Sequence, residues 1–460
     1  MAVNWDTAAA RRYHEGTKHT IQSVRRSARL LDWDNRPHPF KDYEGLDPIA
    51  LPDELDLSWP LRWGAGVIRT REVGPETYHF RAYSSAGALY PVEVYVACAA
   101  TCGLSAGLYH FHPLEPALRR LRATDVRGLL ANAAADESLG AAKAVLAVTG
   151  ILWRTAWKYE TRGYRHLYWD AGTMLANFLE LAACVGEDAR IVTGFVDDAV
   201  NRLVGVDGER EAALALLALG DASPAPPGDD LPEIDLQCRP LSREEVEYPE
   251  AHALHAASRL ETPDDVRRYR GDRQLSGQRS SLRLTRAEVE RILRRRGSIR
   301  EFRLEPIPAA ELATILMYSA GEIPMDVPPR AEIYFVANAV DGLAPGAYRF
   351  TPPENFELLR EGNFRREAGY LALEQALGAY AAATIFFLAD LDAALEAHGN
   401  RAYRTLQLEG GIRGGRIYLS AFARGLGATA STFYDDDVTA FFAPGSTKTP
   451  LLCAAVGRRP

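Results

Sequence analysis

The feature that most constrains this chain of 460 residues is an internal repeat at a spacing of 239 residues. The run Glu93-Val-Tyr-Val is followed 239 positions later by Glu332-Ile-Tyr-Phe. The other matching pairs at this spacing are Gly103 and Gly342, Gly107 and Gly346, Tyr109 and Tyr348, Pro113 and Pro352, Arg162 and Arg401, Arg165 and Arg404, Gly172 and Gly411, and Asp197 and Asp436. Because the register holds without a gap over more than a hundred positions, the repeat predicts two domains with one fold.

The pattern within each copy predicts an α+β fold, in which helices pack on a sheet. In the first copy we expect a strand at 92–97, a hairpin turned by glycines at 103–113 and an apolar strand at 144–151. A long core helix follows, because apolar residues recur at three- and four-residue steps from Ala171 to Val185. Two such copies can pack as an intramolecular pseudo-dimer with a cofactor in the cleft between them.

We divide the chain into four parts: an N-terminal arm at 1–55, a first domain at 56–220, a linker with a connecting helix at 221–284 and a second domain at 285–460. The arm shows little periodicity, so we expect extended chain that wraps over a domain. The linker begins with a stretch rich in Pro, Gly and Asp that is unsuited to regular structure.

Two capping boxes predict where helices begin in and after the linker. The run at 242–245 predicts a short connecting helix, and the run at 285–288 predicts a helix with an apolar stripe behind it. His252 and His255 are three residues apart in an acid-rich segment, and we expect them to be a surface pair.

Composition excludes several classes of protein. The net charge of −8 does not favour binding to nucleic acid or to an anionic membrane. No apolar run approaches the roughly 20 residues of a membrane span. Five scattered cysteines predict neither a disulfide framework nor a metal site. The first residues lack the apolar stretch of a signal peptide, so we expect a cytoplasmic protein.

A loop of small residues, Ser84-Ser85-Ala86-Gly87, precedes the first repeated strand. Small side chains leave backbone N–H groups accessible, so such a loop can cradle a flat, electron-rich ligand. The alternative is a plain turn before a strand. The second copy lacks this loop, because the chain between Gly321 and Glu332 is too short for it.

Several motifs together resemble a known family. Four motifs of the first half carry this resemblance: the loop that runs from Arg81 through the serines to Pro91, the Gly-Leu-Tyr-His-Phe hairpin at 107–111, the Lys158-Tyr159 pair and Arg162-x-Tyr-Arg. With them, the first half resembles the thiazoline/oxazoline dehydrogenase (SagB-type) branch of the nitroreductase-like flavoproteins. The second half, with Arg-Gly-Ser-Ile-Arg-Glu-Phe at 296–302 and a terminal Gly-Arg-Arg-Pro, is similar to the wider nitroreductase family. The resemblance covers about residues 55–220 and 285–460.

The resemblance implies FMN bound between two nitroreductase-type folds. The residues implied for the phosphate are Arg296, Ser298, Arg300, Arg458 and Arg459. Guanidinium groups suit that role because they bind phosphate through paired, charge-assisted hydrogen bonds. The residues implied for the flavin ring are Arg81, Ser84, Ser85, Ala86 and Gly87, with Ser431 and Thr432 from the second half.

The two copies also differ in a complementary way. At the positions of Lys158 and Tyr159 the second copy has Ala397 and His398, and the first copy ends at Asp221 without an arginine pair. We therefore expect one complete FMN site per chain, with the ring side from the first domain and the phosphate side from the second. The mirror site would be vestigial.

The chemistry implied is hydride transfer between a substrate carbon and the flavin, with the protein as proton carrier. Lys158, if its pKa is lowered by burial or by nearby arginines, is the candidate base, and Tyr159 is its candidate partner. The alternative is an exposed Lys beside a packing Tyr.

We expect an FMN-dependent dehydrogenase or oxidase that forms a C=C or C=N bond in a peptide-like or amino-acid-derived substrate, working alone, as a homodimer or with a partner enzyme of a biosynthetic pathway. The alternatives are an NAD(P)H-dependent nitro or quinone reductase and a catalytically decayed accessory subunit.

Overall fold

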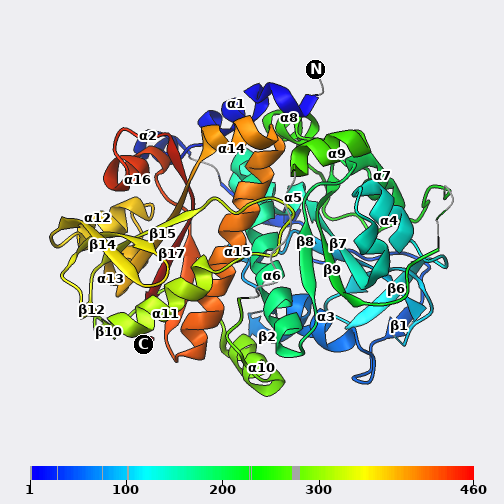
Figure 1. The fold of residues 1–460 in the computed structure, drawn as a ribbon, viewed down its shortest axis with the longest axis horizontal. Helices are drawn as coiled ribbons and strands as arrows, with labels where there is room; N and C mark the ends of the chain where they lie inside the picture. The colour runs from blue at the N-terminus through cyan, green and yellow to red at the C-terminus, as the bar shows by residue number, and fades with distance from the viewer. Residues whose placement is uncertain are drawn as a thin grey trace.

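The computed structural model describes residues 3–27, 30–74, 76–100, 103–226, 228, 231–271 and 280–460. Parts of the predicted linker, at 227, 229–230 and 272–279, lie outside these residues. Two antiparallel sheets lie on either side of a central pair of long helices, α6 (Gly163–Cys184) and α15 (Arg401–Ala423), as Figure 1 shows. The α+β class predicted from the sequence is confirmed.

The first half of the chain forms the larger sheet. Its strands, in spatial order, are β1 (Pro48–Ala50), β6 (Ala117–Arg122), β5 (Gly107–His112), β4 (Val92–Cys98), β7 (Ala142–Ile151), β9 (Glu211–Asp221) and β8 (Ala189–Val192). The helices of this half are α3 (Ser58–Ala65), α4 (Arg127–Ala133), α5 (Leu152–Tyr159), α6 and α7 (Asp197–Val204). β4 and β7 are buried along nearly their whole length, which is why β7 lacks polar alternation.

The second half forms a six-stranded sheet. Its strands, in spatial order, are β14 (Asn355–Glu361), β13 (Gly346–Thr351), β11 (Glu332–Ala337), β15 (Ala383–Asp390), β17 (Lys448–Gly457) and β16 (Gly427–Ser431). Its helices are α10 (Arg286–Arg295), α11 (Ala309–Ala320), α12 (Arg365–Leu371), α13 (Ala376–Tyr380), α14 (Leu391–His398), α15 and α16 (Asp435–Phe442). A short parallel pair, β10 (Ile307–Pro308) and β12 (Val340–Asp341), lies beside it.

Strand pairing repeats at the predicted spacing. Tyr95 pairs with His110 between β4 and β5, and their counterparts 239 residues later, Tyr334 and Arg349, pair between β11 and β13. The same register therefore builds the centre of both sheets.

The two halves meet where α6 crosses α15. A Cβ atom on Gly172 would lie 2.4 Å from the carbonyl oxygen of Leu408, and one on Gly411 would lie 2.4 Å from that of Trp169. Leu408 and Trp169 are themselves 239 residues apart, so the crossing is reciprocal. Such self-complementary contact is the hallmark of an interface with twofold symmetry.

The repeat loses its ungapped register after these helices. Arg162 and Arg165 of the first half bind Asp435, with N···O distances of 3.0 and 2.7 Å. In the mirrored contact, Arg401 and Arg404 bind Asp197. The structural partner of Asp197 is therefore Asp435, at a spacing of 238, and the sequence-based match to Asp436 was wrong by one residue.

The first part of the N-terminal arm is helical, where extended chain was expected; residues 36–55 contain no helix and include the strand β1. It contains a 3₁₀ turn (Val3–Asp6), α1 (Ala8–Gly16) and α2 (Ile21–Arg26), and the linker contains a similar helix pair, α8 (Pro249–Ala257) and α9 (Pro263–Arg270). Threonine caps α2 and α9 through a capping box in each case. Figure 1 shows α1 and α8 close together above the crossing helices.

Contacts of α1 and α8 are reciprocal as well. The imidazole of His14, on α1, lies 3.5 Å from the Tyr403 hydroxyl, and that of His255, on α8, lies 3.1 Å from the Tyr164 hydroxyl. Tyr164 and Tyr403 are a repeat pair. His255 is buried, so the expectation of a surface histidine pair was wrong for this residue.

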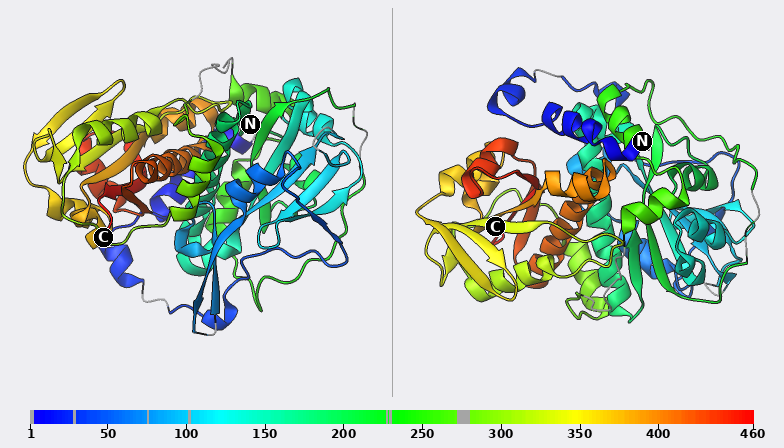
Figure 2. Two further views of the ribbon diagram at one scale, coloured as in Figure 1. Left: turned by 90° about the horizontal axis from the view of Figure 1, so that it is seen from below. Right: turned by 45° about the horizontal axis from the view of Figure 1, so that its top comes forward.

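Three further local outcomes concern the predicted helices and hairpins. Thr285 caps α10 as predicted. No helix begins at 242–245, because Asn35 pairs with the backbone of Glu244 there, through hydrogen bonds of 2.9 and 3.0 Å. A hairpin of β2 (Val67–Val73) and β3 (Glu76–Arg81) was not predicted; it projects from the body of the first half, as the left view of Figure 2 shows.

Short 3₁₀ turns complete the fold at Trp33–Asn35, Ala86–Ala88, Glu137–Ala141 and Glu160–Arg162. Among the described residues, none of the helices combines the length and the apolar character that crossing a membrane requires.

Candidate functional site

A cavity of about 320 Å³ lies between the two halves. The first half lines it with the serine loop, the end of α5 and one face of α6, and the second half lines it with the segment after α10 and the end of β16. Ten residues predicted from the sequence line this cavity: Ser84, Ser85, Ala86, Gly87, Lys158, Tyr159, Ser298, Arg300, Ser431 and Thr432. Tertiary structure thus brings together residues that are up to 348 positions apart in the chain.

Gly87 makes the contact between the serine loop and the Lys-Tyr pair. Its φ of +63° is in the left-handed region, which favours glycine. A Cβ atom here would lie 3.1 Å from the Tyr159 hydroxyl and 3.3 Å from Lys158 Nζ. Any side chain would therefore crowd both residues, so glycine is required for the loop to approach them.

Asp170, on α6, binds the serine loop through hydrogen bonds. Its carboxylate accepts a hydrogen bond from the Ser85 hydroxyl and one of 3.0 Å from the backbone N–H of Ala86. Ser85 Oγ in turn accepts from the N–H of Tyr90 at 2.9 Å. Burial raises the pKa of Asp170 to about 7, against the opposing effect of these two hydrogen bonds. Sequence reasoning missed Asp170, because an aspartate inside a helix carries no motif.

The Lys158 side chain is exposed in the cavity and lies over the ring of Tyr159, with Nζ 5.5 Å from the ring centre. Desolvation, followed by the positive charges of Arg300 and Arg36, lowers the pKa of Lys158. Burial raises the pKa of Tyr159, so its hydroxyl remains protonated at neutral pH. The pair therefore combines an amine that deprotonates more readily than usual with a hydrogen-bond donor.

His166 is a second residue that sequence reasoning missed. Its ring stacks on Tyr159 with 4.0 Å between ring centres, and its Nδ1 lies 3.1 Å from the carbonyl oxygen of Arg162. Burial lowers the pKa of His166 to about 3, so it is neutral. The contact with a carbonyl oxygen places the proton on Nδ1 and leaves Nε2 as an acceptor.

The second half supplies the polar end of the cavity. Ser298 and Arg300 follow α10 and are both exposed. The hydroxyl of Tyr418, on α15, lies 2.9 Å from Ser298 Oγ and accepts hydrogen bonds from Ser84 Oγ at 3.2 Å and from the backbone N–H of Ala430 at 2.7 Å. One hydroxyl therefore touches three segments of the cavity wall.

Four arginines that were expected at the cofactor do not line the cavity. Arg81 is buried and donates to the carbonyl oxygens of Pro39 and Val92. The guanidinium of Arg296 donates to the carbonyl oxygens of Arg81 and Tyr83, each at 2.9 Å. It thereby ties the strand before the serine loop to the second half. Arg458 and Arg459 donate to the carbonyl oxygens of Pro306 and Gly425.

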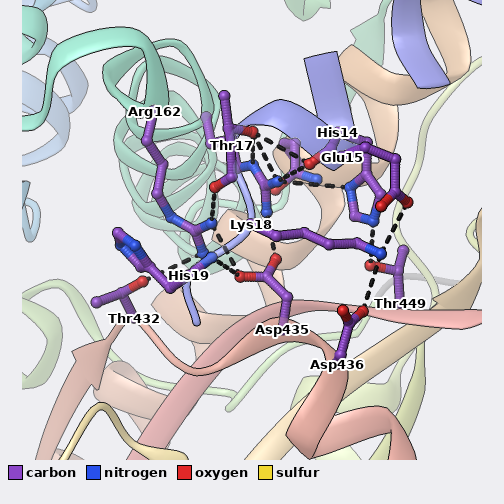
Figure 3. Close-up of polar contacts among 12 residues, drawn as sticks. His14, Glu15, Thr17, Lys18, His19, Arg162, Thr432, Asp435, Asp436 and Thr449 are labelled. Atoms are coloured by element: carbon purple, nitrogen blue, oxygen red, sulfur yellow. Dashed lines mark hydrogen bonds and ion pairs between the residues drawn. The ribbon is translucent and has the colours of Figure 1, made fainter. Parts of the chain in front are cut away.

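The N-terminal segment contacts residues next to Thr432 of the cavity wall. Arg162 donates to Thr432 Oγ1 at 3.3 Å and to the carbonyl oxygen of Thr17. The backbone N–H of His19 donates to Asp435 at 2.8 Å, and Lys18 bridges to Asp436 at 2.8 Å. Figure 3 shows this network, in which the arm, the first half and the second half meet.

The mirrored position of the cavity is filled by protein. Thr193 and Gly194 correspond to Ser431 and Thr432 at the spacing of 238. Their N–H groups both donate to the carboxylate of Asp326, each at 2.8 Å. The ring of Tyr269 packs against Gly194, where a Cβ atom would lie 2.8 Å from it.

The counterpart of Tyr159 at this mirrored position is His398. Its ring centre lies 5.5 Å from that of Tyr269, and its Nδ1 hydrogen-bonds the Tyr269 carbonyl oxygen at 2.7 Å. Side chains of Asp326, Tyr269 and His398 therefore lie at the mirrored position.

Comparison with known proteins agrees with this architecture. Residues 61–221 match the model of the nitroreductase family. A candidate nitroreductase from Anabaena variabilis, solved at 1.80 Å resolution, superposes with a TM-score of 0.82 at 27% identity, over 98% of this chain and 99% of that one. The match therefore extends over both halves.

Two curated proteins are similar over part of the chain. The microcin B17-processing protein McbC of Escherichia coli is 30% identical over 154 residues, which are 31% of this chain and 55% of that protein. A candidate nitroreductase of Methanocaldococcus jannaschii is 28% identical over 184 residues, which are 37% of this chain and 91% of that protein. This chain thus spans only about half the length of the E. coli protein. Residues 61–221 are therefore similar to the nitroreductase family.

Proposed function

We propose that this protein is an FMN-dependent dehydrogenase or oxidase that forms a C=C or C=N bond in a peptide-like or amino-acid-derived substrate. The observation that carries this proposal is the placement of Lys158 and Tyr159 against Gly87 in the wall of a cavity between the two halves. A base and a hydroxyl beside a loop of small residues are what removal of a proton and a hydride from adjacent atoms requires.

The cavity fits FMN in size and in chemistry. Its volume of about 320 Å³ falls in the range of roughly 300–1,000 Å³ that is usual for small-molecule sites. Ser298 and Arg300 offer a hydroxyl and a guanidinium at one end, which suits a phosphate. Ser84 to Gly87 offer small side chains at the other wall, which suits a flat ring. We therefore assign the phosphate to Ser298 and Arg300 and leave the buried Arg81 and Arg296 as anchors of the loop.

The flavin of bound FMN would supply the acceptor for the hydride. Lys158 takes the substrate proton at Nζ, and partial desolvation together with the charges of Arg300 and Arg36 makes this amine deprotonate more readily than an ordinary lysine. The Tyr159 hydroxyl stays protonated and orients the substrate by donating a hydrogen bond, and its ring is held in place by the stack on His166.

We further propose that residues 56–220 and 285–460 are two nitroreductase-like domains that pack as an intramolecular pseudo-dimer. The reciprocal glycine contacts of α6 and α15 and the reciprocal Arg-Asp contacts support this arrangement. Under this proposal the helix pairs α1–α2 and α8–α9 are repeated parts of the two domains, and the chain holds one FMN because Asp326 and Tyr269 fill the second position.

Similarity to McbC supports a peptide-derived substrate and a partner in a biosynthetic pathway, since that protein is named for processing microcin B17. Similarity to the M. jannaschii protein favours the second candidate function, an NAD(P)H-dependent nitro or quinone reductase. A third candidate function is that of an accessory subunit that binds no flavin.

One experiment separates these functions. The chain is purified with FMN, and the visible flavin band is followed under argon after mixing with a thiazoline-containing peptide or with NADPH. Bleaching by the azoline peptide supports the dehydrogenase. Bleaching by NADPH alone supports the reductase. A chain that stays colourless after FMN is added contradicts both.

A further inference from the structure

We infer that Tyr418 is a positioning residue that makes the Ser298 hydroxyl a hydrogen-bond donor into the cavity, and that it thereby selects a phosphorylated flavin over an unphosphorylated one. This inference rests on the proposed function. Tyr418 does not line the cavity itself, but its hydroxyl contacts residues that do.

Counting hydrogen bonds at the Tyr418 hydroxyl gives the direction of each. The backbone N–H of Ala430 can only donate, and Ser84 Oγ donates as well, so both lone pairs of the Tyr418 oxygen are used. The single proton of this hydroxyl must then go to Ser298 Oγ, 2.9 Å away. Tyr418 is buried, so its hydroxyl depends on these three protein partners.

The consequence concerns Ser298. Because its oxygen accepts from Tyr418, its own proton is free to point into the cavity that it lines. The three hydroxyls form a chain of donors, from Ser84 through Tyr418 to Ser298, and such chains strengthen their terminal donor. A phosphate oxygen accepts only, so it suits this end of the chain, and Arg300 provides the matching charge.

The first half of the chain lacks an equivalent of the Tyr418 hydroxyl. The residue 239 positions before Tyr418 is Leu179, which has no hydroxyl. The aromatic ring has a separate structural contact, because the guanidinium of Arg296 lies 5.8 Å from its centre. Tyr418→Phe therefore removes the hydroxyl chain and keeps the packing of the ring.

Titrations with FMN and with riboflavin test the inference, with flavin fluorescence as the readout and thermal unfolding as the check on folding. In Tyr418→Phe we expect the Kd for FMN to rise about three- to tenfold, the usual scale for a charge-assisted hydrogen bond. The Kd for riboflavin should rise less than the Kd for FMN, because riboflavin has no phosphate to lose the Ser298 contact. Tyr348→Phe is the matched control, since its hydroxyl donates to the Ala344 carbonyl oxygen at 2.7 Å in the second half and is not part of the cavity wall.

A double-mutant cycle gives the decisive comparison. Ser298→Ala alone should weaken FMN binding at least as much as Tyr418→Phe, and adding Tyr418→Phe to Ser298→Ala should cause no further loss. An unchanged FMN affinity in Tyr418→Phe, an equal loss for both flavins, or additive losses in the cycle would each overturn the inference while the proposed function stands. A wild-type chain that binds neither flavin would overturn both.

Discussion

Gly172 and Gly411 occupy equivalent places on the two long helices, and each faces the backbone of the other helix at a distance that admits no side chain. The carbonyl oxygens of Leu408 and Trp169 lie 2.4 Å from where the two Cβ atoms would be. This crossing fixes how the halves meet; α6 lines the candidate site and Tyr418 of α15 contacts its wall, so the geometry of the site depends on these two glycines.

Alanine at either glycine should destabilise the whole chain. Backbone cannot yield as a flexible side chain would, so Gly172→Ala or Gly411→Ala should lower the free energy of unfolding by about 1–3 kcal/mol or more. Urea denaturation followed by circular dichroism measures this. Gly16→Ala is the control, because nothing lies within 4 Å of its Cβ position, and it should change stability by no more than about 0.5 kcal/mol. A neutral Gly172→Ala would contradict the crossing described here.

Replacement of Lys158 should stop turnover and leave the flavin bound. Lys158→Arg keeps a positive charge, but a guanidinium does not act as a base near neutral pH. We expect both Lys158→Ala and Lys158→Arg to lose at least about 100-fold in kcat with the azoline substrate, the usual scale for a general base. The flavin spectrum serves as the control for an intact site. Normal turnover in Lys158→Arg would remove the base assignment.

Loss of the positive charge at Arg36 should shift the pH profile of the reaction. Lys158 must be neutral to act as a base, and the charge of Arg36 is one of the influences that lower its pKa. In Arg36→Gln the pKa of Lys158 rises, so the acidic limb of kcat/KM should move to higher pH. Arg71→Gln, an exposed arginine on the neighbouring hairpin, should leave the limb in place. A shift to lower pH would contradict the assignment.

The carboxylate of Asp170 should make stability depend on pH. Burial raises its pKa in the folded chain to about 7 from 3.8, so between these values the folded state holds a proton that the unfolded state has released. The contribution of Asp170 to stability is therefore fully present below about pH 4 and is lost as the pH rises toward 7.

Denaturation of the flavin-free chain at several pH values tests this. The stability of the wild type minus that of Asp170→Asn should fall from pH 4 to pH 7, by at most about 1.4 kcal/mol per pH unit. A difference that is constant, or that rises with pH, would contradict the buried, protonated carboxyl.

Titration with FMN should end at one flavin per chain. The mirrored position is filled by Asp326, whose carboxylate accepts from the N–H groups of Thr193 and Gly194, and by the ring of Tyr269. Absorbance of the purified complex, with FMN released by denaturation, gives the ratio. A ratio of two would show that these side chains move aside for a second flavin.

Much of the site was predicted because its residues form local motifs. The serine loop, the Lys158-Tyr159 pair and the Ser298-x-Arg300 run are each contiguous, and all of them line the cavity. Asp170, His166 and Tyr418 were missed, because each is a single polar residue in a helix and becomes part of the site through partners far away in the chain.

Four arginines that were predicted to bind the cofactor lie outside the cavity wall. A guanidinium satisfies backbone carbonyl groups as well as it satisfies phosphate, so a motif alone does not tell which it contacts. Arg296 donates to the carbonyl oxygens of Arg81 and Tyr83, and Arg458 and Arg459 also bind backbone.

By itself, the sequence determined the repeat, the α+β class and the strands at the centre of the first sheet, because periodic apolar residues and equal spacings follow from local geometry. Only the tertiary structure decided that the N-terminal arm and the linker each contain a helix pair, that Asp197 corresponds to Asp435, and that Asp326 occupies the mirrored position. Those features depend on contacts between residues that are far apart in the chain. Such contacts leave no periodic pattern in the sequence, because they form only when the two halves pack against each other.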